Sequence, residues 1–369
     1  MSHFSVLVIG PNVDEQLAPY HEFECTGLDN EFVQDVDVTE RYHKDYMDRK
    51  AQMLRGPDGQ LHSFFTPEGN WDPRFSTPAP SDNKWDKGRR QKFVPAGYTE
   101  VEVPEHTVKT FAEFAKGWGG QEVIPFGHRI DKAGKHKYGY IQLGESGSVL
   151  KIIDRTNPNK KWDWYQVGGR WSGYFRLKPE QMHHAKANLG EPGTFGRGRE
   201  DIAGYTDRAK KGHVDFEYMR NENGAEAAKE WERSRAILGD IPAKWKPWPT
   251  QKWFEENKDE YDIEELRDSY SAQPAIRAFK NDKDFNRDYA WGGFDRFLMT
   301  REAYVRRARN RTIVPYAIVY KGEWIGRGRM GWWGTSLDEI DEDLWIEQAN
   351  KYIDELPDST MLTIVDCHI

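Results

Sequence analysis

Cysteine is scarce in this chain of 369 residues, which contains only Cys25 and Cys367. Two cysteines exclude a disulfide framework and fit a reducing compartment. Long apolar runs are also missing, because no stretch approaches the roughly 18–20 residues that a membrane-spanning helix needs. Residues 1–10 lack a basic leader and a cleavage site, so we expect no signal peptide. These absences predict a soluble cytoplasmic protein with no membrane partner.

An excess of positive charge is missing as well. The chain has 53 Lys and Arg against 61 Asp and Glu, which gives a formal net charge of −8. Sequence-independent binding to duplex DNA depends on basic side chains that neutralise phosphates. We therefore expect no general duplex DNA binding. Residues 151–250 are nevertheless rich in basic side chains and residues 321–369 in acidic ones. These stretches could be a basic ligand site and a solvated tail, or both could simply be solvated faces.

Aromatic residues are abundant, with 15 Trp, 17 Tyr and 18 Phe. Such a composition argues against disorder and predicts a core built from large side chains. Residues 3–9 and 361–369 both read as buried strands. Chain ends are loose unless a sheet holds them, so we expect these two strands to pair.

The segments between the two terminal strands predict an α+β fold. Its sheet would be mixed or antiparallel and closed by the N- and C-terminal strands, and the ferredoxin-like arrangement is one such plan. Hydrophobic periodicity and turn residues predict strands, helices and a second hairpin. Strands are expected at 138–143 and 149–153, helices at 39–49, 107–116 and 337–356, helical pieces within 206–311, and a hairpin at 312–326. The expected division is a first part of the core at 1–178, a helix-rich insertion at 179–311, and a final hairpin, helix and strand at 312–369.

The run 161–175 (KWDWYQVGGRWSGYF) is the most distinctive part of the chain. Two aromatic stretches flank Gly168-Gly169, a pattern that predicts a hairpin. With the run 326–334 it could form a surface that stacks on bases and binds phosphates. Alternatively, two hairpins pack their tryptophans together in the core. The candidate ligand-binding residues are Trp164, Gly168, Gly169, Arg170, Trp171, Arg327, Arg329, Trp332 and Trp333. Neither glycine run has the context of a phosphate-binding or dinucleotide-binding motif, so no cofactor is identified.

The two terminal strands carry a second candidate site. If they pair, His3 comes close to Asp366 and His368, which share one face of the last strand while Cys367 faces the other way. This arrangement permits a catalytic acid–base pair. Two alternatives stay open: these are structural polar groups, or they form a metal site. Another group with zinc-type side chains lacks the usual paired spacing; it consists of His21, Glu22, Glu24 and Cys25.

Several segments together resemble a family of uncharacterised proteins from tailed bacteriophages and related bacterial genomes. They are residues 1–10 and 15–20, the stretch 161–171 with its GGRW motif, residues 215–220 and 330–334, and the final VDCHI at 365–369. The resemblance implies a phage origin and a non-virion role in the host cell cytoplasm. The family has no established activity, so the resemblance assigns no catalytic residue.

These observations favour a phage accessory protein for host takeover or counter-defence that binds, and in one version processes, a nucleotide-type ligand. Whether it is an enzyme stays open. The alternative is a non-catalytic inhibitor that binds a host defence protein through an acidic and aromatic surface. Its acidic residues would be Asp338, Glu339, Asp341, Glu342 and Asp343.

Overall fold

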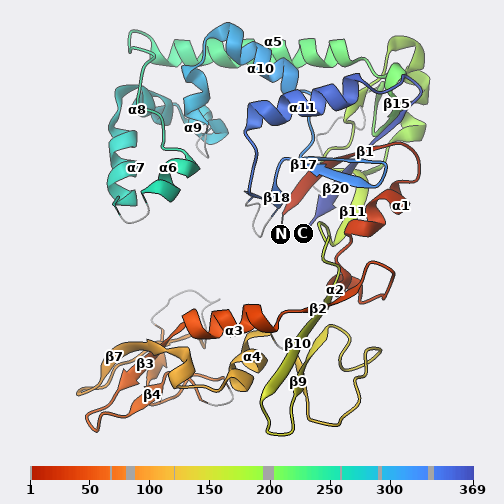
Figure 1. Cartoon of the computed structure of the whole chain (residues 1–369). Coiled ribbons are helices and arrows are strands. Elements are labelled where there is room, and N and C mark those ends of the chain that lie inside the picture. The colour runs from red at the N-terminus through yellow and green to blue at the C-terminus, as the bar shows by residue number, and fades with distance from the viewer. Residues whose placement is uncertain are drawn as a thin grey trace. The chain divides into compact units, whose positions relative to one another are not determined.

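The computed structural model describes residues 2–66, 69–79, 88–119, 121–193, 203–257, 260–289, 293–330 and 336–369. The chain folds into two compact units (Figure 1). Unit 1 consists of Met1–His21 with Lys161–Ile369, and unit 2 is Glu22–Lys160. The division expected from the sequence placed all of 1–178 in one part, so it did not separate Glu22–Lys160 as a unit of its own.

Unit 1 is built on a mixed sheet. In spatial order its strands are β13 (Glu191–Pro192), β11 (Trp164–Gly169), β20 (Met361–His368), β1 (His3–Ile9), β16 (Ala317–Tyr320) and β17 (Glu323–Gly326), with β15 (Arg208–Lys210) also paired to β20. The α+β class and the pairing of the first and last strands are confirmed, because β1 and β20 are antiparallel neighbours. β1 is also parallel to β16. Neighbouring strands of a ferredoxin-like sheet are all antiparallel, so this pair sets the sheet apart from that arrangement.

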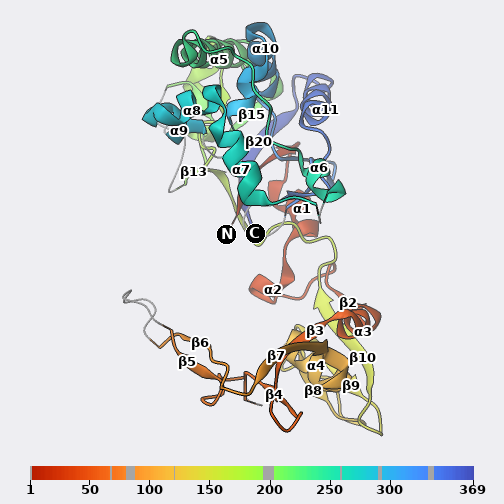
Figure 2. The same ribbon diagram turned by 90° about the vertical axis from the view of Figure 1, so that its left-hand side faces the viewer.

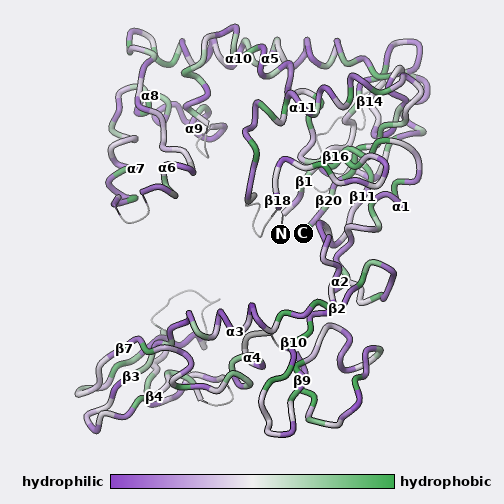
Figure 3. Tube along the Cα trace, in the orientation of Figure 1, coloured by the Kyte–Doolittle hydropathy of each residue, from purple (hydrophilic) through white to green (hydrophobic). Residues whose placement is uncertain are grey.

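Both faces of the central strands are covered. This explains why β1 is an almost continuous apolar run rather than an alternating one. Leu7 and Ile364 pack on one face with Trp345 of α11 (Glu342–Asp354). Val6 and Val365 pack on the other with residues that include the end of α1 (Val13–Leu17). Figure 3 shows the hydrophobic residues along these strands.

The helices that follow β15 form a layer with its own aromatic core in unit 1. They are α5 (Phe216–Leu238), α6 (Gln251–Glu256), α7 (Ile263–Ala272), α8 (Pro274–Asn281), α9 (Lys283–Tyr289) and α10 (Arg301–Arg311). All lie within the stretch predicted to be helical, and α5 and α10 lie side by side (Figures 1 and 2). The rings of Phe279, Phe285 and Phe297 are completely buried in the core of this helical layer. In the described parts of the chain, no helix is both long and apolar enough to cross a membrane.

Unit 2 contains smaller sheets and two longer helices. Its strands are β2 (Gln34–Asp37), β3 (Lys50–Arg55), β4 (Leu61–Ser63), β5 (Ser76–Pro78), β6 (Arg90–Lys92), β7 (Thr99–Pro104), β8 (Glu122–Ile124), β9 (Gly139–Leu143) and β10 (Val149–Thr156). They pair as β2-β10-β9-β8, β4-β3-β7 and β5-β6. α3 (Thr39–Asp48) and α4 (Phe111–Gly119) contribute Tyr42 and Ala115 to a core with Ile141 and Ile152. The strands predicted at 138–143 and 149–153 are confirmed as β9 and β10.

The hairpin predicted around Gly168-Gly169 is wrong. β11 does not pair with the aromatic stretch that follows it; it pairs with β20 and β13 instead. The chain then turns out of the sheet, and β12 (Phe175–Arg176) pairs with β14 (Tyr205–Thr206). The second predicted hairpin is correct, because β16 and β17 are joined by a turn at Lys321-Gly322.

Replacement of Ile364 by alanine tests whether β20 is the centre of unit 1. Ile364 is fully buried between two strands and under α11, so Ile364→Ala should lower the free energy of unfolding by about 2–5 kcal/mol. Leu344→Ala on the exposed side of α11 is the matched control and should cost less than about 1 kcal/mol. Denaturant unfolding measures both, and equal losses would contradict the central position of β20.

Candidate functional site

Two histidine–carboxylate pairs lie at one end of the unit 1 sheet. His3 and His368 stand directly opposite each other on β1 and β20. Nδ1 of His3 lies 2.9 Å from Oδ1 of Asp366, and Nδ1 of His368 lies 2.7 and 2.8 Å from the two carboxylate oxygens of Asp163. A carboxylate at Nδ1 fixes the orientation of an imidazole, as acid–base chemistry requires. The structure therefore brings together His3, Asp366 and His368 and adds Asp163.

Aromatic contacts hold this histidine cluster together. Trp164 stacks on His368 with ring centroids 5.0 Å apart and an interplanar angle of 17°. His3 meets both rings edge-on. Trp164 is still 42% exposed, whereas His368 is buried. Trp164, expected among the ligand-binding residues, thus covers a histidine of the predicted catalytic group.

Cys367 and the metal alternative find no support in this geometry. Cys367 faces away from the cluster, as predicted, and packs with Val365. Burial, reinforced by the charges of Asp366 and Asp163, raises the pKa of its thiol well above the ordinary value, so the thiol stays protonated. Among the described residues, no group of three or more His, Cys, Asp or Glu side chains is arranged to hold a metal ion.

The turn after β11 is held by two buried carboxylates from distant parts of the chain. Asp366 accepts a hydrogen bond from the backbone N–H of Arg170 at 2.9 Å. Asp207 has no exposed surface and accepts the backbone N–H groups of Gly173 and Gly190 at 2.7 and 2.8 Å, among other donors. Burial raises the pKa of Asp207, although these hydrogen bonds oppose the shift. Both carboxylates therefore act as internal acceptors for this turn.

The carboxylates also explain the glycine pair. Gly168 and Gly169 have φ values of +79° and +55°. A Cβ on Gly168 would lie 2.5 Å from Oδ2 of Asp207, and one on Gly169 would lie 2.4 Å from Cβ and Oδ2 of Asp366. Glycine alone suits both the backbone conformation and the close approach. The two glycines are thus accounted for by the packing of this turn.

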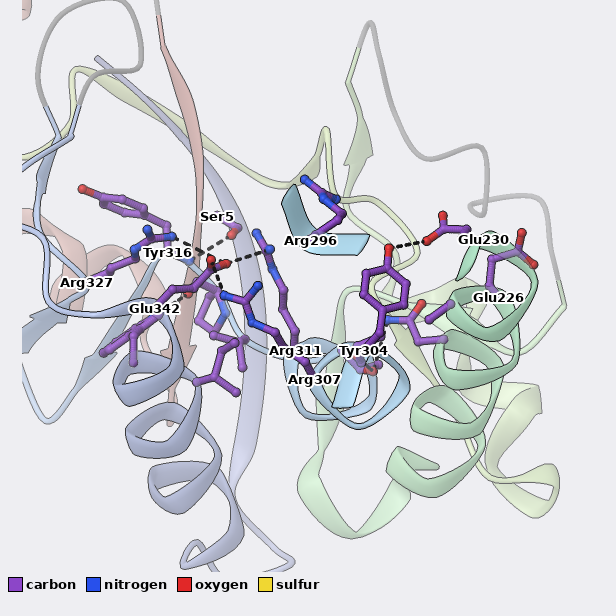
Figure 4. Close-up of a pocket in the computed structure, with 18 of the residues that line it drawn as sticks. Ser5, Glu226, Glu230, Arg296, Tyr304, Arg307, Arg311, Tyr316, Arg327 and Glu342 are labelled. Carbon is purple, nitrogen blue, oxygen red and sulfur yellow. Dashed lines mark hydrogen bonds and ion pairs between the residues drawn. The ribbon is translucent and has the colours of Figure 1, made fainter. Parts of the chain in front are cut away.

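A cavity of about 1010 Å³ opens beside the sheet in unit 1 (Figure 4). Known ligand sites are typically about 300–1,000 Å³, so it lies at the large end of that range. Ser5 of β1 lines it, and Ser5 is the register partner of Asp366. Tyr174, Tyr316 and Trp345 add aromatic surface. The cavity therefore begins next to the histidine cluster, although His3 and His368 are not in its lining.

Three arginines from two segments meet one carboxylate in this lining; together with Glu342 they are called the arginine cluster. Arg307 and Arg311 of α10 each lie 2.7 Å from Glu342 of α11, and Arg327 lies 3.9 Å from it. Burial alone would lower the pKa of Arg307, but its hydrogen bond to Asp343 and the charge of Glu342 outweigh this effect and raise the pKa. The cluster thus gathers three guanidinium groups around one carboxylate.

The opposite wall of the cavity carries acidic side chains together with Arg296, which neighbours Tyr304. Figure 4 shows Glu226 and Glu230 on the α5 side, away from the arginine cluster. Glu230 accepts a hydrogen bond from the hydroxyl group of Tyr304 at 2.9 Å. Burial is the main reason that the pKa of Tyr304 is raised to about 12, and the negative charge of Glu230 adds to it. The phenol therefore stays protonated. The lining therefore has the arginine cluster on one side and a mixture of acidic and basic side chains on the other.

The residues predicted to bind ligand fall in different places. Trp171 and Arg327 line the cavity, whereas Arg329 forms an exposed pair with Asp338 at 3.1 Å. Trp332 and Trp333 lie outside the described residues. Sequence reasoning missed the arginines of α10. Their spacing of four residues places them on one helix face, and that is the signal that could have found them.

The acidic segment of the inhibitor hypothesis is paired within the molecule. Glu339 binds Arg327 at 2.6 Å and Asp343 binds Arg307 at 2.7 Å. Asp341 caps α11 by accepting the N–H groups of the residues two and three positions later. These carboxylates already have internal partners.

Comparison with known proteins adds no assignment. No protein-family model matches the chain, and neither a curated protein nor a solved structure matches it.

Gly168→Ala tests the role of the buried carboxylates, with Gly322→Ala as its control. Both glycines have φ +79°, but a Cβ at Gly322 meets nothing within 4 Å. The two variants share the backbone strain, and only the first also forces Asp207 to move. We expect Gly168→Ala to lower the free energy of unfolding by about 1–3 kcal/mol more than the control. Equal losses in denaturant unfolding would show that backbone conformation alone requires the glycine.

Proposed function

We propose that this chain binds a nucleotide-type ligand in the cavity, with its phosphates on the arginine cluster and its base against Trp171. The observation that carries the proposal is the meeting of Arg307, Arg311 and Arg327 inside a cavity of ligand size. Planar guanidinium groups match phosphate oxygens in pairs. A flat aromatic face contributes about 1–3 kcal/mol per stacked base.

The proposed setting is an infected bacterial cell. There the protein would be a phage accessory factor for counter-defence or host takeover, acting in the host cytoplasm. The sequence resemblance to phage proteins supports this part of the proposal. A host protein is the alternative partner, but the internal pairing of Glu339, Glu342 and Asp343 leaves less free charge for such an interface.

Processing of the ligand is the second part of the proposal. His3 lies two residues before Ser5 on the same face of β1, and Ser5 lines the cavity. A ligand group that extended past Ser5 would approach the pair of His3 and Asp366. The acid–base roles of His3, Asp366 and His368 remain predictions.

Native mass spectrometry of the protein purified from expressing cells tests the binding proposal directly. We expect an added mass that denaturation releases as a nucleotide. A thermal-unfolding screen with the four common ribonucleoside diphosphates and triphosphates at millimolar concentration complements it. An empty protein whose melting temperature none of these nucleotides raises would overturn the proposal.

Arg327→Gln should weaken binding of the best nucleotide by about tenfold or more, because a hydrogen bond between charged groups contributes roughly 1.5–3 kcal/mol. Arg329→Gln is the matched control, since it removes the same charge two residues away, outside the lining of the cavity. Calorimetric titration should give the control a dissociation constant within about twofold of the unmodified protein. Equal weakening in both variants would indicate general electrostatic attraction rather than a site.

Trp171→Leu should distinguish the contribution of the base to the affinity from that of the phosphates. Loss of stacking should weaken nucleotide binding by about tenfold and leave inorganic pyrophosphate binding unchanged. Trp164→Leu removes an exposed tryptophan outside the cavity lining and should change neither affinity. If Trp171→Leu weakens both ligands equally while the fold is retained, the base does not contact this indole.

A further inference from the structure

Glu342 has an unusual position in the arginine cluster. Its Oε2 lies 2.7 Å from Nη2 of Arg307, and its Oε1 lies 2.7 Å from Nη1 of Arg311 and 3.9 Å from Nη1 of Arg327. Both carboxylate oxygens are therefore engaged by guanidinium groups. One negative charge stands between three positive charges inside the cavity.

This carboxylate does not satisfy the cluster fully. Among the described residues, Nε of Arg327 is buried and has no hydrogen-bond partner. Asp343 and Glu339 assist from the periphery, where each binds one arginine. A phosphate group offers more negative charge and one more oxygen than a carboxylate, so it matches three guanidinium groups better.

The side chain of Glu342 can leave without disruption of its helix. Glu342 is the first residue of α11, and that end is held by Asp341, whose carboxylate accepts the N–H groups of Asp343 and Leu344 at 2.9 and 3.1 Å. Trp345 anchors the same turn through its indole N–H, which donates to the carbonyl oxygen of Pro315 at 2.9 Å. A change of rotamer at Glu342 therefore moves the carboxylate and leaves the turn in place.

We propose that Glu342 is an internal competitor that occupies the phosphate subsite until a ligand with at least two phosphates displaces it. This inference rests on the proposed function and narrows it to diphosphate and triphosphate ligands. A monophosphate gains less from the exchange than a diphosphate, because its charge of about −1.5 to −2 exceeds that of the displaced carboxylate by at most about one unit, whereas a second phosphate adds more. As a result, only a ligand with enough negative charge to displace Glu342 binds at this site.

Calorimetric titration with inorganic pyrophosphate, inorganic phosphate and ADP tests this inference on the full chain. Glu342→Gln removes the competing charge and should bind pyrophosphate about fivefold more tightly than the unmodified protein. Asp343→Asn is the matched control: it removes the neighbouring carboxylate, which binds Arg307 but does not line the cavity. We expect its affinity to stay within about twofold.

Pyrophosphate affinity that is unchanged or weaker in Glu342→Gln would overturn the competitor role. If ADP still binds the unmodified protein in that case, the proposed function stands without it. If neither ADP nor pyrophosphate binds any of the three proteins, both proposals fail. Preference for inorganic phosphate over pyrophosphate would overturn the charge threshold.

A second measurement uses the unmodified protein and does not depend on the folding of a variant. Carbodiimide-coupled labelling of carboxylates, read by peptide mass spectrometry, reports the release of Glu342 from its arginines. Addition of pyrophosphate should increase labelling at Glu342 severalfold and leave the exposed Glu355 unchanged. Constant or reduced labelling at Glu342 under saturating pyrophosphate would overturn the inference.

Discussion

The turn that follows β11 depends on two carboxylates buried away from water. Asp207 and Asp366 both come from segments further along the chain and replace the water that the N–H groups of this turn would otherwise bind. A buried carboxylate is costly unless several donors surround it. Here backbone N–H groups supply most of those donors, and they can do so only because Gly168 and Gly169 allow the chain to approach closely. The glycines, the carboxylates and the turn therefore form one interdependent unit.

The position of the cavity follows from this unit. Trp171 comes directly after Arg170, whose backbone N–H donates a hydrogen bond to Asp366. This bond holds the segment that places the Trp171 indole in the cavity wall. Asp366 uses its other oxygen to hold His3. One buried side chain thus links the histidine cluster to the wall of the cavity. Rigid supports of this kind are what a binding or catalytic site needs.

Sequence reasoning succeeded where the signal was local and failed where it was not. The strands β1 and β20, the hairpin of β16 and β17, and the helical stretch could be predicted because periodicity and turn residues lie within each segment. The hairpin at Gly168-Gly169 failed because the same pattern serves a turn whose acceptors are Asp207 and Asp366, far along the chain. Unit 2 was missed as a separate unit for a related reason, since local patterns predicted β9 and β10 but do not show which segments pack together. In the candidate site, His3, Asp366 and His368 could be brought together from strand pairing alone. Asp163 could not be added from the sequence, because it reaches His368 only when β11 pairs with β20.

The uneven charge of the sequence has a similar explanation. The acidic C-terminal segment invited an interpretation as a solvated or partner-binding surface. In the folded chain, Glu339, Glu342 and Asp343 instead bind arginines from α10 and from the end of β17. Charges that look unbalanced along the chain are thus largely neutralised across the fold. At Glu342, three guanidinium groups meet one carboxylate within the cavity lining, and Asp343 and Glu339 each bind one of these arginines from outside that lining. Ligand binding there is an exchange of one anion for another, so the affinity depends on how much better a ligand satisfies those arginines than the protein's own side chain does.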